Sequence, residues 1–180
     1  EIAGTENPQG VIAVCEMPGE VTMEEIAALK SGIVVALDRI QDPGNLGTII
    51  RTAGWFGVKA LLAEKGTDDV FNPKVARSTV GSLGSFPILY TGLNAALALM
   101  EQKGWQVVLL DGNPGALPIR NIVKSPKMIL VTGNEANGIS PALITGNRQR
   151  VMIPRSGLET PVESLNAAVA AGIALFCVAD

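Results

Sequence analysis

Histidine is missing from this sequence of 180 residues. Its absence excludes catalytic triads with a histidine base, cysteine–histidine nucleophile pairs and most zinc sites. Cysteine is scarce as well, because Cys15 and Cys177 are the two in the chain and lie far apart in apolar stretches. We expect two buried free thiols in a reducing compartment and no metal site, since the spacing suits neither a disulfide framework nor a ligand cluster.

Charged residues are few, at 17%, while apolar residues make up 47% of the chain. The net charge is −3 and the sequence pI is about 5.0. A composition of this kind predicts one globular, rather apolar domain. It excludes a broad basic surface, so any nucleic-acid contact must come from local clusters or from another domain.

Membrane and export signals are also missing. The first residues show no basic region followed by an apolar run, so no signal peptide is predicted. The longest apolar segment, residues 165–179, includes Asn166 and is shorter than the roughly 18 residues of a membrane span. We expect a buried or interface helix there, no membrane partner and a cytoplasmic protein.

Apolar runs and helical patterns alternate along the chain. Strands are expected at residues 11–14, 33–37, 59–63, 88–90, 105–110, 128–132 and 150–153. Helices are expected at residues 22–32, 45–56, 72–80, 93–102 and 164–179. The strands are apolar without polar alternation, which is typical of a mostly parallel α/β sheet with helices on both faces.

Three polar segments end or follow these apolar runs: residues 42–51, residues 133–138, and residues 154–166. Ligands bind at the carboxyl ends of strands in open α/β sheets, so these segments predict a binding site. Neither the G-x-G-x-x-G dinucleotide fingerprint nor a P-loop occurs. Glu135, in the second segment, could accept hydrogen bonds from a ligand or cap the next helix.

Several polar residues in these segments have a purely structural alternative. Asn45 and Ser164 stand where helix N-caps are expected. Asn166 would be buried in the first turn of an apolar helix, and a buried amide needs partners. Arg51 and Trp55 are neighbours at i and i+4, pointing away from the apolar face of their helix. That face is either solvated or covered by a partner subunit or a nucleic-acid base.

Taken together, the segments resemble the three motifs of the SpoU/TrmH family of RNA 2′-O-ribose methyltransferases, in the SPOUT superfamily. The first reads Asp42-Pro-Gly-Asn-Leu-Gly-Thr-Ile-Ile-Arg-Thr-Ala53, followed by Gly57. The second reads Thr132-Gly-Asn-Glu-Ala-Asn-Gly138, and the third combines Ile153-Pro154 with Ser164-Leu-Asn-Ala-Ala-Val-Ala170. The resemblance covers nearly the whole chain from about Gly10, including residues 72–81.

The resemblance implies a SPOUT domain over residues 11–180, with a C-terminal deep trefoil knot that binds S-adenosylmethionine and a homodimer that completes the site. It also implies that residues 1–10 are a linker remnant after a small N-terminal RNA-binding domain. Ribosomal RNA is favoured over transfer RNA as the partner, because the start of the domain, Pro8-Gln-Gly-Val-Ile-Ala-Val14, is similar to that of ribosomal-RNA members.

Carried over residue by residue, the resemblance implies catalytic and cofactor-binding sets. The implied catalytic residues are Arg51, Asn45, Glu135, Ser164 and Asn166. The implied cofactor-binding residues are Gly133, Asn134, Ile153, Pro154 and Leu165, with residues 111–112 as a weaker candidate.

Two departures from the family pattern stand out. Ala136 takes a position where the family commonly has glycine, which stiffens the second loop. The spacer of residues 155–163 is longer than usual, and it is expected to alter the rim of the pocket or the contact with RNA. A SPOUT-like domain that binds RNA without catalysis, a transfer-RNA ribose methyltransferase and a Rossmann-type oxidoreductase are the alternatives, the last disfavoured by the missing glycine fingerprint.

The chemistry of the implied reaction favours a particular role for Arg51. A ribose 2′-hydroxyl is a poor nucleophile at neutral pH, so the site must orient it and help its proton leave. A guanidinium rarely gives up a proton. The hypothesis is therefore that Arg51 clamps the neighbouring phosphate and stabilises the developing alkoxide, while a carboxylate, the phosphate or water takes the proton.

Overall fold

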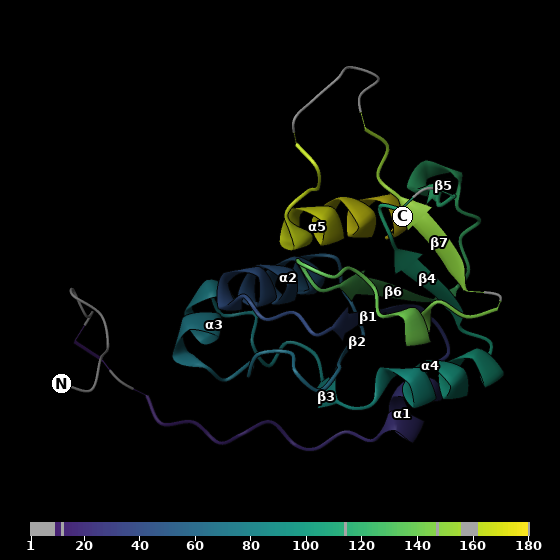
Figure 1. Ribbon diagram of the computed structural model, residues 1–180. Coiled ribbons are helices and arrows are strands. Elements are labelled where there is room, and N and C mark those ends of the chain that lie inside the picture. Colours follow the sequence, from purple (N-terminus) through teal and green to yellow (C-terminus); the bar gives the residue numbers. More distant parts are fainter. Residues whose placement is uncertain (1–9, 12, 114, 147, 156–161, 180) are drawn as a thin grey trace.

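The computed structural model describes residues 10–11, 13–113, 115–146, 148–155 and 162–179. Within them the chain forms one sheet of seven strands in the order β3-β2-β1-β6-β4-β7-β5 (Figure 1). Every pairing between named strands is parallel. The strands are β1 (Gly32–Asp38), β2 (Ala60–Ala63), β3 (Ile88–Tyr90), β4 (Gln106–Leu110), β5 (Leu117–Pro118), β6 (Lys127–Gly133) and β7 (Gln149–Met152).

Helices cover both faces of this sheet. They are α1 (Met23–Ala27), α2 (Pro43–Trp55), α3 (Pro73–Ser78), α4 (Leu93–Gln102) and α5 (Ala167–Val178), with 3₁₀ turns η1 (Ile119–Asn121) and η2 (Pro141–Leu143). The α2, α3 and α5 helices pack on one face, while α1 and α4 pack on the other (Figure 1). The predicted α/β class, with a parallel sheet between two helical layers, is confirmed.

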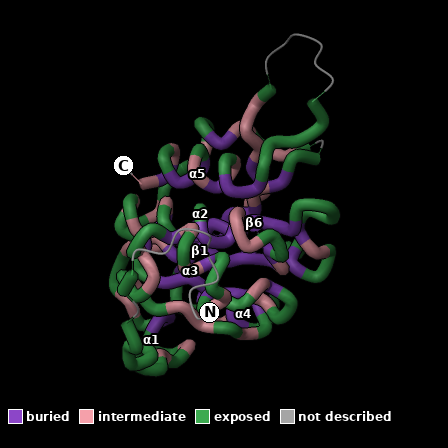
Figure 2. Tube along the Cα trace, turned by 90° about the vertical axis from the view of Figure 1, so that its left-hand side faces the viewer, coloured by how far each residue is buried: buried purple, intermediate pink, exposed green. Residues whose placement is uncertain are grey.

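The double covering explains why the strands are continuously apolar. Val35 and Leu37 of β1 join the core beneath α2 and α5, while Val34 and Ala36 join the core above α4. Successive side chains of a strand point to opposite faces, so both sets must be apolar. Figure 2 shows the result as a buried sheet between more exposed layers.

The register of the inner strands decides where the polar loops meet. Asp38 at the end of β1 pairs with Gly133 at the end of β6. Leu110 at the end of β4 pairs with Thr132 of β6 and with Val151 of β7. Because the strands are parallel and in register, four carboxyl ends lie at the same edge of the sheet.

Several boundaries differ from the sequence-based expectations. No strand forms at residues 11 and 13–14, which are exposed and have no neighbouring strand to pair with. Cys15 is exposed and not buried as predicted, while Cys177 is half-buried. The first helix ends at Ala27, well before Gly32, and the two-residue β5 was not expected.

Other expectations lie outside the reach of the structure. Apart from Gly10, the expected linker lies outside the described residues. The trefoil knot stays a prediction, with which the position of β6 between β1 and β4 is compatible. Among the described residues, no helix combines the length and apolarity needed to cross a membrane.

The close approach of α2 and α3 depends on a glycine. A Cβ added at Gly47 would overlap the Cβ of Ser78 and lie 2.8 Å from the carbonyl oxygen of Val75. A Cβ at Gly54, in the same helix, would meet Ser82 and Phe86 at 3.5 Å or more. Only the first glycine is therefore required by packing.

We predict different effects of alanine at these two glycines. Gly47→Ala forces α2 and α3 apart and should lower the free energy of unfolding by about 1–3 kcal/mol. Gly54→Ala should leave stability unchanged or raise it by up to about 1 kcal/mol, because alanine is the better helix former. Urea unfolding of both variants is the measurement, and equal effects would contradict this account of the α2–α3 contact.

Candidate active site

Three predicted catalytic residues, from segments far apart in the sequence, form a chain of hydrogen bonds at the carboxyl edge of the sheet. The side-chain amide of Asn45 donates to the carboxylate of Glu135 over 2.9 Å. The side-chain amide of Asn166 donates to the carbonyl oxygen of Asn45 over 2.8 Å. This Glu135–Asn45–Asn166 chain joins the first, second and third motif segments.

Asn45 owes its position to the start of α2. The N-cap of this helix is Asp42, whose side chain accepts from the backbone N–H of Asn45 over 2.7 Å, with Pro43 in the first turn. The expectation that Asn45 is the N-cap is therefore wrong. Because Asp42 fulfils the capping role, the side-chain amide of Asn45 is left to bridge the other two loops.

Asn166 is the N-cap of α5. Its side-chain oxygen accepts from the backbone N–H groups of Ala168 and Val169, at 3.0 and 3.2 Å. Ser164, expected as the cap, is exposed and makes no hydrogen bond with a described residue. Asn166 is itself exposed, so its predicted burial is wrong, although its amide does have the partners that were expected.

The loop that carries Glu135 is built around Asn134. The side-chain oxygen of Asn134 accepts from the backbone N–H groups of Ala136 and Asn137, and its backbone pairs in both directions with Gly138. Its side-chain amide donates to the carbonyl of Arg39 over 2.8 Å. These contacts show that Asn134 shapes the loop, while its expected contact with the cofactor stays a prediction.

Gly133 permits the same loop to fold back. A Cβ at this position would lie 2.5 Å from the backbone nitrogen of Ile139 and overlap the carbonyl of Gly138. Asp38 and Arg39, which the motif pattern does not single out, hold the far end of the loop at Ser140. The sequence signal for Asp38 was a carboxylate closing an otherwise apolar strand.

Arg51 lies outside the Glu135–Asn45–Asn166 chain. It is exposed, and none of the hydrogen bonds among described residues involves its side chain. Arg51 lies six positions after Asn45 in α2, about 9 Å along the helix and about 120° around it. Trp55, one turn further on, is 85% exposed.

The ends of β6 and β7 hold the remaining implied cofactor-binding residues. Ile153 and Pro154 are half-buried directly after β7, and Leu165 is exposed directly before Asn166. The hydroxyl of Thr132 is buried without a hydrogen-bond partner among the described residues. Residues 156–161 of the long spacer lie outside the described part of the chain.

Asp111 follows β4 at the same edge and is engaged with its neighbours. Its carboxylate accepts from Arg150 over 2.7 Å and from the backbone and side chain of Asn113 at 3.0 and 2.7 Å. Burial by itself raises the pKa of Asp111, but these hydrogen bonds and the charge of Arg150 outweigh it and leave the pKa below its ordinary value.

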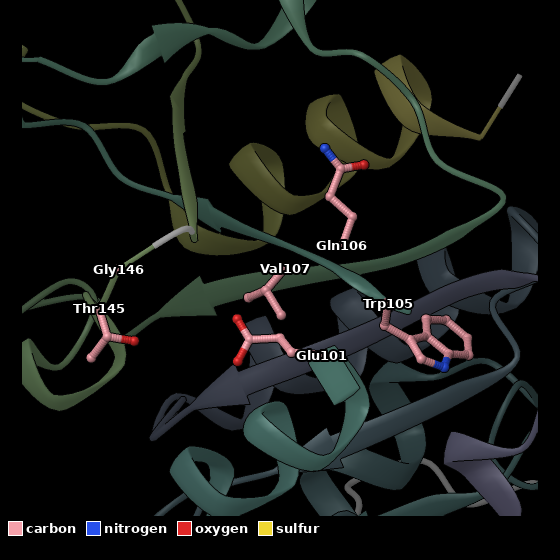
Figure 3. Close-up of a pocket in the computed structure, with 6 residues that line it drawn as sticks. All are labelled: Glu101, Trp105, Gln106, Val107, Thr145 and Gly146. Atoms are coloured by element: carbon pink, nitrogen blue, oxygen red, sulfur yellow. The ribbon is translucent and has the colours of Figure 1, made fainter. Parts of the chain in front are cut away.

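A hollow of about 460 Å³ opens at the opposite end of the strands, where β4 begins (Figure 3). Its lining includes Trp105, Val107 and Thr145. The one carboxylate there, Glu101, forms a salt bridge with Arg148 at 3.0 Å. None of the predicted site residues lines it, so the polar edge of the sheet remains the candidate site. Within the described residues, no group of three or more His, Cys, Asp or Glu side chains is arranged to hold a metal ion.

Comparisons with known proteins agree on one family. Residues 32–176 match the SpoU rRNA Methylase family. The chain is 37% identical over 175 residues to the 23S rRNA guanosine 2′-O-methyltransferase RlmP of Bacillus subtilis, covering 97% of this chain and 66% of that protein. It is 32% identical over 170 residues to a 23S rRNA uridine 2′-O-methyltransferase of Streptomyces viridochromogenes, covering 92% of this chain and 59% of that protein.

Solved structures give the same picture. An AdoMet-bound rRNA methyltransferase from Sinorhizobium meliloti superposes with a TM-score of 0.79 at 35% identity, covering 87% of this chain and 59% of that one. AviRb from Streptomyces viridochromogenes, in complex with AdoMet, superposes with a TM-score of 0.78 at 30% identity, covering 91% of this chain and 62% of that one. The chain thus spans less than two thirds of the length of these relatives.

We predict a pH-dependent contribution of Asp111 to stability. Asp111→Asn should lower the free energy of unfolding by about 1–3 kcal/mol at about pH 7. Because the folded-state pKa is lower than the unfolded value of about 3.9, the stabilisation is present above that value and is lost as pH falls through the folded-state pKa.

Urea unfolding between about pH 7 and about pH 2 is the measurement, with exposed Glu16→Gln as the control. The difference in the free energy of unfolding between wild type and Asp111→Asn should become smaller as the pH is lowered. A difference that stays constant over this range would show that the charge of Asp111 contributes nothing to folding.

Proposed function

This chain belongs to the SpoU rRNA Methylase family, and we propose that it transfers a methyl group from S-adenosylmethionine to a ribose 2′-hydroxyl of ribosomal RNA. The observation that carries the proposal is the Glu135–Asn45–Asn166 chain, which joins all three motif segments at one sheet edge. Relatives 32% and 37% identical are named as 23S rRNA 2′-O-methyltransferases. A ribosomal substrate would place the enzyme in the cytoplasm.

Ribosomal RNA is preferred over transfer RNA on the strength of these identities. The two solved structures of tRNA-modifying proteins are 23% and 24% identical to this chain, and at that level they support the fold alone. The rRNA methyltransferases with solved structures are 30% and 35% identical.

The carboxyl edge of β6, β4 and β7 has features that fit the cofactor. The hydroxyl of Thr132 is buried and has no partner among the described residues, and a ligand that bonds to it would remove a cost of about 1–3 kcal/mol. Backbone groups near Gly133, Ile153 and Leu165, with Pro154 as apolar wall, would hold S-adenosylmethionine there. When bound, its sulfonium supplies an already activated methyl group, so the acceptor oxygen needs no metal.

The chain's own residues would orient the sugar and accept its proton. Glu135 uses one carboxylate oxygen for Asn45, and the other accepts no hydrogen bond from a described residue. That second oxygen is the proton acceptor that we favour among the carboxylate, the phosphate and water. The guanidinium of Arg51, which has no partner among the described residues, would clamp the phosphate beside the reacting ribose and stabilise the alkoxide.

A homodimer would bring Arg51 to the site. Trp55 of α2 and Val169, Ile173 and Phe176 of α5 are apolar side chains exposed by 37–85%. The two helices pack together, with Gly172 directly facing Thr52. We define these four exposed side chains as the α2–α5 face; a second copy of the chain would cover it and would place Arg51 of one subunit beside Glu135 of the other.

Replacing Arg51 tests the proposed chemistry. Arg51→Lys keeps the charge but loses the planar two-pronged donor, so methyl transfer from labelled S-adenosylmethionine to ribosomal RNA should fall by about 100-fold. Cofactor binding, followed by calorimetry, should stay within about twofold of wild type. Near-wild-type turnover would reject the clamp, and a wild type that binds no cofactor at millimolar concentration would favour a non-catalytic RNA-binding domain.

The dimer makes a separate prediction. Phe176→Glu places a charge on the α2–α5 face, so sedimentation should show a monomer in place of a dimer, and methyl transfer should be lost. The control is Met17→Glu, at a site 65% exposed in the N-terminal segment, which should change neither the oligomeric state nor the activity. Co-expression of Arg51→Ala with Asn45→Ala should restore about a quarter of the activity, because half of the random dimers then hold one intact shared site. No restoration would assign Arg51 to the site of its own subunit.

A further inference from the structure

A buried carboxylate closes the far end of the loop that carries Glu135. Asp38, the last residue of β1, is fully buried. One carboxylate oxygen accepts from the backbone N–H of Ser140 over 2.6 Å, and the other accepts from the guanidinium of Arg39 over 3.1 Å. A buried carboxylate is costly unless it is paired and hydrogen-bonded, so this one persists because both its neighbours satisfy it.

Arg39 completes the connection from a backbone conformation that few residues adopt. Its φ is 60°, in the left-handed region that costs a non-glycine residue about 1 kcal/mol or more. From there its guanidinium donates to the hydroxyl of Ser140 over 2.6 Å, while its carbonyl accepts from the side chain of Asn134 over 2.8 Å. A single residue thus contacts both ends of the loop of residues 134–140.

These contacts define the place of Glu135. The loop leaves β6 at Gly133, opposite Asp38 in the sheet register, and returns to Ser140 beside the same carboxylate. Glu135 is exposed, and within the described part of the chain its side chain makes one hydrogen bond, to Asn45. Its position therefore depends on the two ends of the loop, and both ends are fastened to residues 38 and 39.

We propose that Asp38 and Arg39 form a positioning pair that holds the catalytic loop, so that Glu135 meets Asn45 and the acceptor ribose in the geometry that methyl transfer requires. The proposal rests on the proposed function for its catalytic consequence, while the fastening of the loop is independent of it. Misplacing a catalytic group by about 1 Å costs about 100-fold in rate, so a loosened loop should lower kcat more than RNA affinity.

The test replaces Asp38 with asparagine in the full chain. The side-chain NH2 of the asparagine would face either the N–H of Ser140 or the guanidinium of Arg39. Both of these are donors, and two donors cannot bond to each other. Hydrogen exchange of the backbone amides of residues 135–140 should accelerate by about tenfold or more. The matched control is Glu101→Gln, which neutralises the salt-bridged carboxylate at the opposite end of the strands, and it should leave this exchange within about twofold of wild type.

Kinetics distinguish positioning from general destabilisation. In Asp38→Asn, kcat for methyl transfer should fall by about tenfold or more, with the KM for RNA within about twofold of wild type. In a Glu135→Ala background, Asp38→Asn should lower the remaining kcat by no more than about twofold, because the group that Asp38 positions is gone. A full loss in both backgrounds, or unchanged exchange and kcat, would overturn the proposal.

A second variant covers the case in which Asp38→Asn does not fold. Arg39→Gly removes the guanidinium and suits the left-handed backbone, so it should fold and still accelerate exchange at residues 135–140. Unchanged exchange in this variant would overturn the proposal. A wild type that transfers no methyl group, while both variants loosen the loop, would reject the proposed function and leave the positioning pair supported.

Discussion

The position of β6 between β1 and β4 is the constraint on which the rest of this molecule depends. An inner strand of a parallel sheet is hydrogen-bonded along both edges and covered on both faces, so its register can shift only if two neighbours shift with it. That register puts Gly133 level with Asp38 and Thr132 level with Leu110. The loops of three strands therefore leave the sheet at one level.

Links between polar side chains then fasten those loops to one another. Asp42 caps α2 and Asn166 caps α5, which fixes the two helix starts before any ligand binds. Asn45 is the common member, because its one amide both donates to Glu135 and accepts from Asn166. An amide suits this role, since it offers a donor and an acceptor and does not titrate.

Much of the fold could be predicted from the chain because its strands are apolar on both sides. The strand at residues 88–90 and the helix at residues 93–102 have the predicted bounds, and five further strands differ by at most one residue at either end. The strand predicted at residues 11–14 does not form at residues 11 and 13–14, because a strand needs a neighbouring strand, which local sequence cannot reveal. The β5 strand was missed for the converse reason, since two residues become a strand only through their pairing with β7.

The sequence by itself determined the family, the class of sheet and the residues that gather at its edge, because motif order, apolar periodicity and cap residues are local properties of the chain. Only the tertiary structure decided which residue plays which part. It replaced Asn45 by Asp42 and Ser164 by Asn166 as helix caps, and it assigned Asn134 to its own loop. It alone showed which residues Asp38 and Arg39 contact, since a hydrogen bond between residues about a hundred positions apart depends on the packing of the sheet.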